Sequence, residues 1–245
     1  MIHYHGGPIT PLSVAHAVWA TRHAFVSYEW PEQVALVAEI CQSFAIDNGA
    51  FSVWRRGGSL DVNGYVAFVD EWKRHPAFDW CLIPDAIDGG EADNDRLLGE
   101  YRNAGGDLLT SVPVWHLHES FDRLVRLCRT FPRVALGSSG EWAQVGTPQW
   151  WQRMGEAMDA ICDAEGRPPC KLHGLRMLNP TVFSQLPLSS ADSTNVAQNH
   201  ARQRQMYQLS PAMAGLTLVD RIERHASAPR WTRTFGTQCN LELVG

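Results

Sequence analysis

The stretch SFAIDNGAF (residues 43–51) is an apolar run that ends in a reactive side chain, Asp47, and continues into a turn. Seven other short apolar runs also end in a polar or reactive group, and the last of them contains Asp192. These seven are IHYHGG (2–7), AFVSY (24–28), WCLIPD (80–85), SVPVWH (111–116), RVALGSS (133–139), CKLHG (170–174) and LSSADST (188–194). A (β/α)8 barrel presents its active site on strands that alternate with helices and finish on functional groups. The runs therefore predict an α/β fold, a (β/α)8 TIM barrel, with a candidate site at one rim.

The length and composition of the chain fit one soluble barrel. It has 245 residues, and such barrels need about 250. Hydrophobic residues make up 44% and charged residues 19% of the chain, which is ordinary for a globular protein. No apolar run approaches the roughly 20 residues of a membrane span, and MIHYHGGPIT lacks the pattern of a secretory signal. We therefore expect a cytoplasmic protein with no membrane partner.

Helical patterns fill most of the gaps between the runs. Thr10 is expected to cap the first helix, with Pro11 at its first position. Helices are expected over residues 10–21, 31–42, 62–74, 92–104, 119–130, 148–165 and 197–208, with one turn at most in NPTVFSQLP (179–187). An open doubly wound sheet would need a Gly-rich phosphate loop, which HGGP matches poorly. We therefore divide the chain into a catalytic barrel, residues 1–193, and a helical C-terminal extension packed on it, residues 194–245.

Cysteine spacing and charge limit the alternatives. The six cysteines lie far apart with no Cys-x-x-Cys, which argues against a disulfide framework and against a cysteine-rich zinc site. The net charge of -5 does not indicate nucleic-acid binding, but it leaves room for a local basic patch. Residues 193–245 hold six arginines against three acidic residues, so this segment is the main candidate for such a patch.

Asp47 and Asp192 would meet at the carboxyl-terminal mouth of the predicted barrel. Two carboxylates are the minimum equipment for chemistry at an anomeric carbon: one attacks C1′ to form a covalent glycosyl-enzyme, and the other moves protons. An aspartate at a strand end is also a common helix cap or turn acceptor. The neighbouring residues therefore have to decide between these two interpretations.

The neighbouring residues favour a purine-binding pocket. Asp47 is followed by Asn-Gly-Ala-Phe, a turn that allows a ligand to approach closely and places Phe51 to stack on a planar base. Asp85 could accept two N–H bonds from a guanine-like edge. The turn formed by residues 137–140, Gly-Ser-Ser-Gly, offers amides and hydroxyls to a carbonyl oxygen.

At these residues the chain resembles the tRNA-guanine transglycosylase superfamily. The family's Asp-Ser-Gly-Gly-Phe motif, which carries its general acid/base, is similar to the Asp-Asn-Gly-Ala-Phe of residues 47–51. Its base-recognising aspartate is matched by Asp85, its Gly-rich segment by residues 135–141, and its nucleophilic aspartate by Asp192. The order of the four segments is kept over roughly residues 40–200. The resemblance implies a TIM barrel that exchanges guanine for a 7-deazaguanine through a covalent Asp192 intermediate, with no cofactor.

The departures from the family pattern bear on the substrate. The family's zinc-binding cysteine cluster is absent, since Cys239 stands alone near the end of the chain, and its Pro-Thr-Arg segment is replaced by Ser-Thr-Asn at residues 193–195. His116 stands where the family has a glutamine. The chain also lacks an appended RNA-binding domain. The resemblance is therefore closer to the 7-deazaguanine DNA-modification branch of phages and bacteria, and DNA is favoured over tRNA; a free nucleoside and a homodimer both stay open.

The expected site has three parts. Asp192 and Asp47 are its catalytic residues. The residues expected to bind the base are Asn48, Phe51, Asp85, His116, Gly137, Ser138, Ser139 and His173. The residues expected to contact nucleic-acid phosphates are Arg55, Arg56, Arg202 and Arg204.

Two other classes of function remain open at this point. His3, His5 and His173, together with Asp192, are also typical of a metal-dependent amidohydrolase-like hydrolase, in which histidines hold a divalent metal that activates water. A barrel that only binds nucleobases or nucleic acid, without chemistry, is the third alternative. Metal analysis tests the hydrolase, and substitution of the two aspartates tests the inactive barrel.

Overall fold

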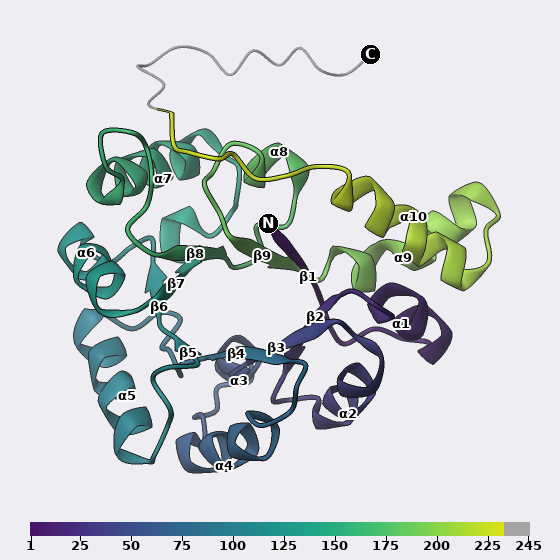
Figure 1. Cartoon of the computed structure of the whole chain (residues 1–245), viewed down its shortest axis with the longest axis horizontal. Helices are drawn as coiled ribbons and strands as arrows, with labels where there is room; N and C mark the ends of the chain where they lie inside the picture. The colour runs from purple at the N-terminus through teal and green to yellow at the C-terminus, as the bar shows by residue number, and fades with distance from the viewer. Residues whose placement is uncertain (233–245) are drawn as a thin grey trace.

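The computed structural model describes residues 1–232, and its strands form a barrel inside a ring of helices (Figure 1). The strands are β1 (Ile2–Gly6), β2 (His23–Ser27), β3 (Ser43–Asp47), β4 (Phe78–Leu82), β5 (Ser111–Val112), β6 (Val114–His116), β7 (Arg133–Gly137), β8 (Lys171–Gly174) and β9 (Ser190–Ser193). Their order in the sheet is β5-β4-β3-β2-β1-β9-β8-β7-β6, and the pairings are parallel. The predicted α/β barrel class is confirmed.

The sheet has nine strands because the run SVPVWH is divided at Pro113. β5 pairs with β4, whereas β6 pairs with β7 on the other edge of the sheet. Proline has no N–H to donate to a sheet, but the Pro113 carbonyl accepts a hydrogen bond from the Ala135 amide at 2.9 Å. The chain through Pro113 therefore joins the two edges, and the barrel is nearly closed.

Helices lie between successive strands on the outside of the barrel. They are α1 (Leu12–Trp19), α2 (Pro31–Ile40), α3 (Ala50–Arg55), α4 (Val62–Trp72), α5 (Glu91–Asn103), α6 (Phe121–Thr130), α7 (Pro148–Ile161), α8 (Pro180–Phe183), α9 (Asn195–Tyr207) and α10 (Pro211–Glu223). Each expected helical range overlaps one of them, and α8 is the short turn expected between the last two runs. Among residues 1–232, no helix has both the length and the apolar character that crossing a membrane requires.

Apolar side chains pack in two layers, one inside the barrel and one between the strands and the helices. The inner layer consists of Tyr4, Phe25, Ala45, Trp80, Leu82, Val112, Val114 and Ala135. Successive strand residues face opposite sides, so Phe44 and Ile46 pack outward around the inward Ala45. The same alternation directs Asp47 into the mouth of the barrel.

Three local expectations are wrong. The first helix begins at Leu12, and Pro11, not Thr10, is its N-cap residue, with no side-chain cap. The segment after Asp47 is not only a turn, because Gly49, with a φ of 79°, leads directly into α3. β4 ends at Leu82, so Asp85 lies in the loop after the strand, although the run WCLIPD extended to it.

The C-terminal helices pack on the barrel, where they complete its ring of helices. α10 packs on both α9 and α1, and α9 packs on β1. Figure 1 shows the pair between α1 and α8, at the place of a final helical unit. Residues 224–232 then run past α8 toward α7, where the Trp231 indole donates to Asp159 at 2.7 Å. The rest of the expected extension, residues 233–245, lies outside the described residues.

Candidate active site

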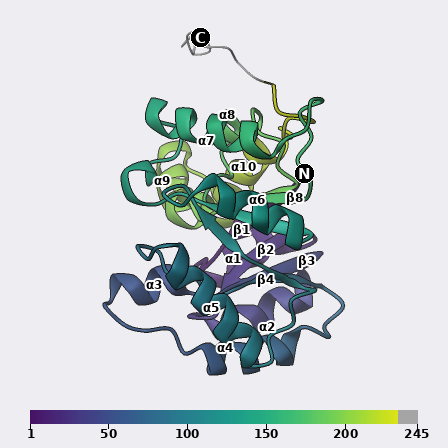
Figure 2. The same cartoon turned by 90° about the vertical axis from the view of Figure 1, so that its left-hand side faces the viewer.

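Three aspartates converge at the carboxyl ends of the strands. Asp47 ends β3, Asp192 lies on β9, and Asp85 lies in the loop after β4. Burial, followed by the charges of Asp85 and Asp192, raises the pKa of the Asp47 carboxyl to about 7, although backbone amides of Asn48 and Gly49 oppose the shift. In Figure 2 the helix that follows Asp47, α3, lies at the end of the barrel opposite the N-terminus. At neutral pH Asp47 can therefore both donate and accept a proton, as a general acid/base must.

The raised pKa of Asp47 makes the stability of the protein depend on pH. A carboxyl whose pKa is higher in the folded than in the unfolded chain stabilises the fold below its unfolded pKa, and this contribution is lost as the pH rises through the folded value of about 7. We expect Asp47→Asn, which removes the charge, to be more stable than the natural protein by about 2–4 kcal/mol at about pH 8, and by roughly half as much at about pH 5. Urea unfolding at both values measures the difference, and a gap independent of pH would contradict it.

Asp192 is held by contacts from two neighbouring segments. His173 Nε2 lies 3.3 Å from Asp192 Oδ1, and the backbone amide of Arg176 donates to the same oxygen at 3.0 Å. His173 Nδ1 lies 2.9 Å from the Ser190 hydroxyl. Because burial lowers the pKa of His173, the ring is neutral at pH 7 and donates its Nε2 proton to the carboxylate. Both contacts hold the Asp192 carboxyl in place on the inner face of the barrel.

Arg176 is a site residue that the sequence did not indicate. It has a φ of 59°, in the left-handed region that few residues other than glycine adopt. Its amide donates to Asp192, its guanidinium donates to the Ser138 carbonyl, and the guanidinium carbon lies 5.5 Å from the centre of the Phe51 ring. Arg176 thus connects the predicted nucleophile with two predicted base-binding segments. Nothing in the local sequence LRM marks this backbone conformation.

Asp85 is positioned by two residues that we had expected to contact the base. Asn48 Nδ2 donates to Asp85 Oδ1 at 2.8 Å, and His116 Nε2 lies 2.8 Å from Asp85 Oδ2. Asn48 also donates to the Ile83 carbonyl and accepts from the Ala50 amide. A carboxylate has about four acceptor positions, so Asp85 keeps acceptor capacity for a ligand while Asn48 and His116 fix its orientation.

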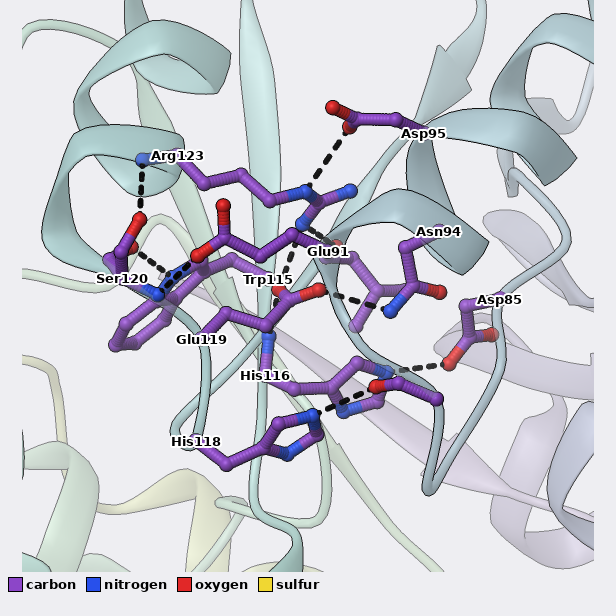
Figure 3. A network of polar contacts seen from close by, with 12 residues as sticks. Asp85, Glu91, Asn94, Asp95, Trp115, His116, His118, Glu119, Ser120 and Arg123 are labelled. Carbon is purple, nitrogen blue, oxygen red and sulfur yellow. Dashed lines mark hydrogen bonds and ion pairs between the residues drawn. The ribbon is translucent and has the colours of Figure 1, made fainter.

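A buried polar network lies behind His116 (Figure 3). Glu119 accepts from the His116 amide at 2.9 Å and from Asn94 Nδ2 at 2.8 Å. It also forms an ion pair of 2.6 Å with Arg123, whose side chain is 2% exposed. Arg123 in turn donates to the Val114 carbonyl at 2.9 Å. The network connects β6 with α6 and holds the backbone that carries His116. The sequence contained a signal for the pair, since Glu119 and Arg123 have the i,i+4 spacing of helical ion pairs.

Loss of one member of this buried ion pair should destabilise the fold strongly. We expect Glu119→Ala to lower the free energy of unfolding by about 3–5 kcal/mol, because Arg123 keeps its charge without its buried partner. The double substitution Glu119→Gln with Arg123→Met should cost much less, since it leaves no unpaired charge. Chemical denaturation of the three proteins tests this. Equal losses in the single and double variants would show that the ion pair itself is not responsible.

The turn at residues 137–139 contributes less to the site than expected. The Ser138 hydroxyl faces the helical layer, where it accepts from the Trp150 indole at 2.9 Å, so its side chain is not directed at a ligand. The Ser139 hydroxyl lies 2.6 Å from His118 Nδ1. Gly137 is needed for space, because a Cβ there would lie 2.8 Å from His116 Nδ1. The turn therefore mainly supports His116 and His118, whose rings stack at 5.6 Å.

The expected phosphate-binding arginines fall in different environments. Arg55 lies on α3 with its guanidinium carbon 5.9 Å from the centre of Phe51, which is 41% exposed at the rim. Arg56 forms an ion pair with Glu29. Arg202 and Arg204 are exposed on α9, but residues two apart on a helix do not face the same way. Arg55 thus lies beside a predicted base-binding residue.

The metal-ligand set of the alternative hydrolase is not brought together. His3 and His5 flank Tyr4, which points inward, so both face the outer layer. His3 contacts the His225 carbonyl at 3.0 Å and His5 contacts Glu223 at 3.0 Å, whereas His173 lies inside the barrel beside Asp192. Within residues 1–232, no group of three or more histidine, cysteine or acidic side chains is arranged to hold a metal ion.

No protein family, curated protein or solved structure matches this chain in comparisons of its sequence and fold. A conclusion about its function therefore has to rest on the contacts of the three aspartates.

Proposed function

We propose that this chain is a transferase that exchanges a guanine base in nucleic acid for a 7-deazaguanine, through a covalent bond to Asp192. The observation that carries the proposal is the convergence of Asp47, Asp85 and Asp192, with the pKa of Asp47 raised to about 7. Chemistry at an anomeric carbon divides the roles of acid/base and nucleophile between two carboxyl groups. Here the raised pKa of Asp47 suits the acid/base, and Asp192, held by His173 and the Arg176 amide, would be the nucleophile.

The reaction would proceed in two displacements at C1′ of the target nucleotide. In the first, an oxygen of Asp192 bonds to C1′ while the bond from C1′ to N9 of guanine breaks, and the leaving base takes the proton of Asp47. In the second, Asp47, now a carboxylate, accepts the N9 proton of the incoming 7-deazaguanine. Its N9 then bonds to C1′ and releases Asp192 as a carboxylate. Asp47 ends protonated, so the cycle balances without a cofactor.

Recognition of the base would fall to Asp85 and Phe51. Asp85 would accept the ring N–H and the exocyclic amine of guanine, while Asn48 and His116 hold its two oxygens in place. Phe51 would stack on the base or a neighbouring one, next to the guanidinium groups of Arg55 and Arg176. In a duplex the target nucleotide must first be flipped out, at a cost of a few kcal/mol.

Incubation with labelled guanine and either DNA or tRNA tests the proposal. We expect label to enter one polymer, with DNA favoured, because exchange of guanine for guanine uses the same two displacements. A matched incubation should show no abasic sites, since the sugar passes from Asp192 to a base and not to water. No incorporation into either polymer, or release of guanine without replacement, would contradict base exchange.

A further inference from the structure

A cavity of 540 Å³ lies between α8, α9 and α10, outside the barrel. Its size falls within the range of ligand-binding pockets. It is open to solvent on one side, and its polar lining comes mainly from one face of α9 and the last turn of α10. The site built on the three aspartates uses none of these residues, so the cavity has no role in the reaction described above.

The lining of the cavity is basic. Arg202 of α9 and Arg221 of α10 both line it, and no acidic side chain does so within the described part of the chain. Neither guanidinium has an acidic partner among residues 1–232. Glu223 lies two residues from Arg221, but its carboxylate forms ion pairs with His5 and Arg22 and does not line the cavity. Two unpaired guanidinium groups at one cavity favour an anionic ligand, and a phosphate above all.

Gln203 adds a hydrogen-bond donor that has no partner. Its side chain lines the same cavity and is 8% exposed, and its Nε2 is buried with no hydrogen bond in the described structure. A buried amide without a partner costs about 1–3 kcal/mol. An acceptor oxygen supplied by a ligand would satisfy it. The side chain thus points to a ligand rich in oxygen, in agreement with the two arginines.

Two lining residues connect the cavity with the carboxyl ends of the last two strands. Asn179 lies in the segment after β8, and Asn195 begins α9 directly after β9, the strand that carries Asp192. The Leu178 amide donates to the Asp192 carbonyl at 2.9 Å, and the Asn195 amide donates to the Ser193 hydroxyl at 2.9 Å. Part of the cavity lining therefore follows directly in sequence from the strand ends at the barrel mouth.

We infer that the cavity between α8, α9 and α10 binds the phosphate backbone of the nucleic acid next to the target nucleotide, through Arg202, Arg221 and Gln203. The inference rests on the proposed function for its choice of nucleic acid. It also separates the two arginines expected on α9: Arg202 lines the cavity, whereas Arg204 lies on another face with Ala201 and Gln208.

The test measures equilibrium binding of a labelled single-stranded DNA of about 16 nucleotides. Three proteins are compared: the natural protein, the double variant Arg202→Gln with Arg221→Gln, and the single variant Arg204→Gln. The last removes one charge from a face of α9 that does not line the cavity, and it is the control for the loss of Arg202 from the same helix. We expect the double variant to bind roughly tenfold more weakly and to lower the slope of log K against log salt by about 1.4, since each phosphate contact on a single strand contributes about 0.7. The control should change both far less. Gln203→Met, which removes the unpartnered amide without a charge, should also weaken binding.

Each outcome of this test is informative. Equal binding by the double variant and the control would overturn the inference. The inference would also be overturned if deoxyguanosine monophosphate stabilised the natural protein against unfolding while the double variant bound DNA as tightly as the natural protein. The cavity would then hold a free nucleotide. The assay contains no incoming base and needs no turnover. If DNA binding depends on the two arginines but no guanine is exchanged, the proposed reaction fails and the cavity site stands.

Discussion

Asp192→Asn is expected to reduce the rate of guanine exchange by a factor of about 10³ or more, because it removes the carboxylate that is proposed to form the bond to C1′. The amide keeps the shape of the carboxylate and can still accept from the Arg176 amide, so the fold should be retained. The rate of incorporation of labelled guanine into DNA, with circular dichroism as a check of folding, provides the measurement.

Asp88→Asn is the matched control for this variant. It makes the same chemical change in the loop that carries Asp85, but at an exposed position. We expect it to retain nearly the full rate. A folded Asp192→Asn protein that exchanges guanine as fast as Asp88→Asn would remove Asp192 from the mechanism. If neither protein exchanged guanine, the result would favour the inactive-barrel alternative.

Asp47→Asn is expected to lower the exchange rate by about 10²–10⁴, the usual contribution of general acid–base catalysis. In the natural protein the carboxyl must give up a proton in the first displacement and take one in the second. The rate should therefore be greatest near pH 7, where the pKa of Asp47 lies, and fall on both sides. The remaining activity of the variant should lose this maximum.

A pH–rate profile of both proteins checks the role of Asp47. A maximum near pH 7 that persists in Asp47→Asn would assign the titration to another group. Stability and activity should change in opposite directions in this variant, since the same substitution is expected to stabilise the fold at high pH. Such a trade-off is typical of a residue kept at a cost to stability for its chemistry.

The sequence was sufficient to predict the barrel because the apolar runs are short and most of them are separated from the next by a helical pattern. It also predicted Asp47 and Asp192 as neighbours at one rim, since strand alternation places both on the inner face. The sequence did not show which face of β1 lies inside the barrel. Tyr4 points inward because it packs on Trp80 and Phe25, which come from other strands, and the flanking histidines therefore point outward. His3 and His5 were therefore wrongly grouped with His173 as metal ligands.

Contacts between segments distant in the sequence account for most of what was missed. The orientation of the Ser138 hydroxyl is set by Trp150 on α7, and the roles of Asn48 and His116 are set by their shared partner Asp85. Arg176 depends on a left-handed backbone conformation that its leucine and methionine neighbours do not signal. Residue type and spacing can identify reactive groups, but they do not show which polar side chains are already occupied by a partner inside the fold.

The most direct test of base exchange through Asp192 is the isolation of the covalent intermediate. The protein would be mixed with single-stranded DNA without an incoming base, quenched in denaturant, digested and analysed by mass spectrometry. We expect one guanine to be released for each adduct, and the sugar of the DNA to be attached to the peptide that contains Asp192. Turnover of guanine with the adduct on a different residue, or with no adduct at any time in the reaction, would contradict the account.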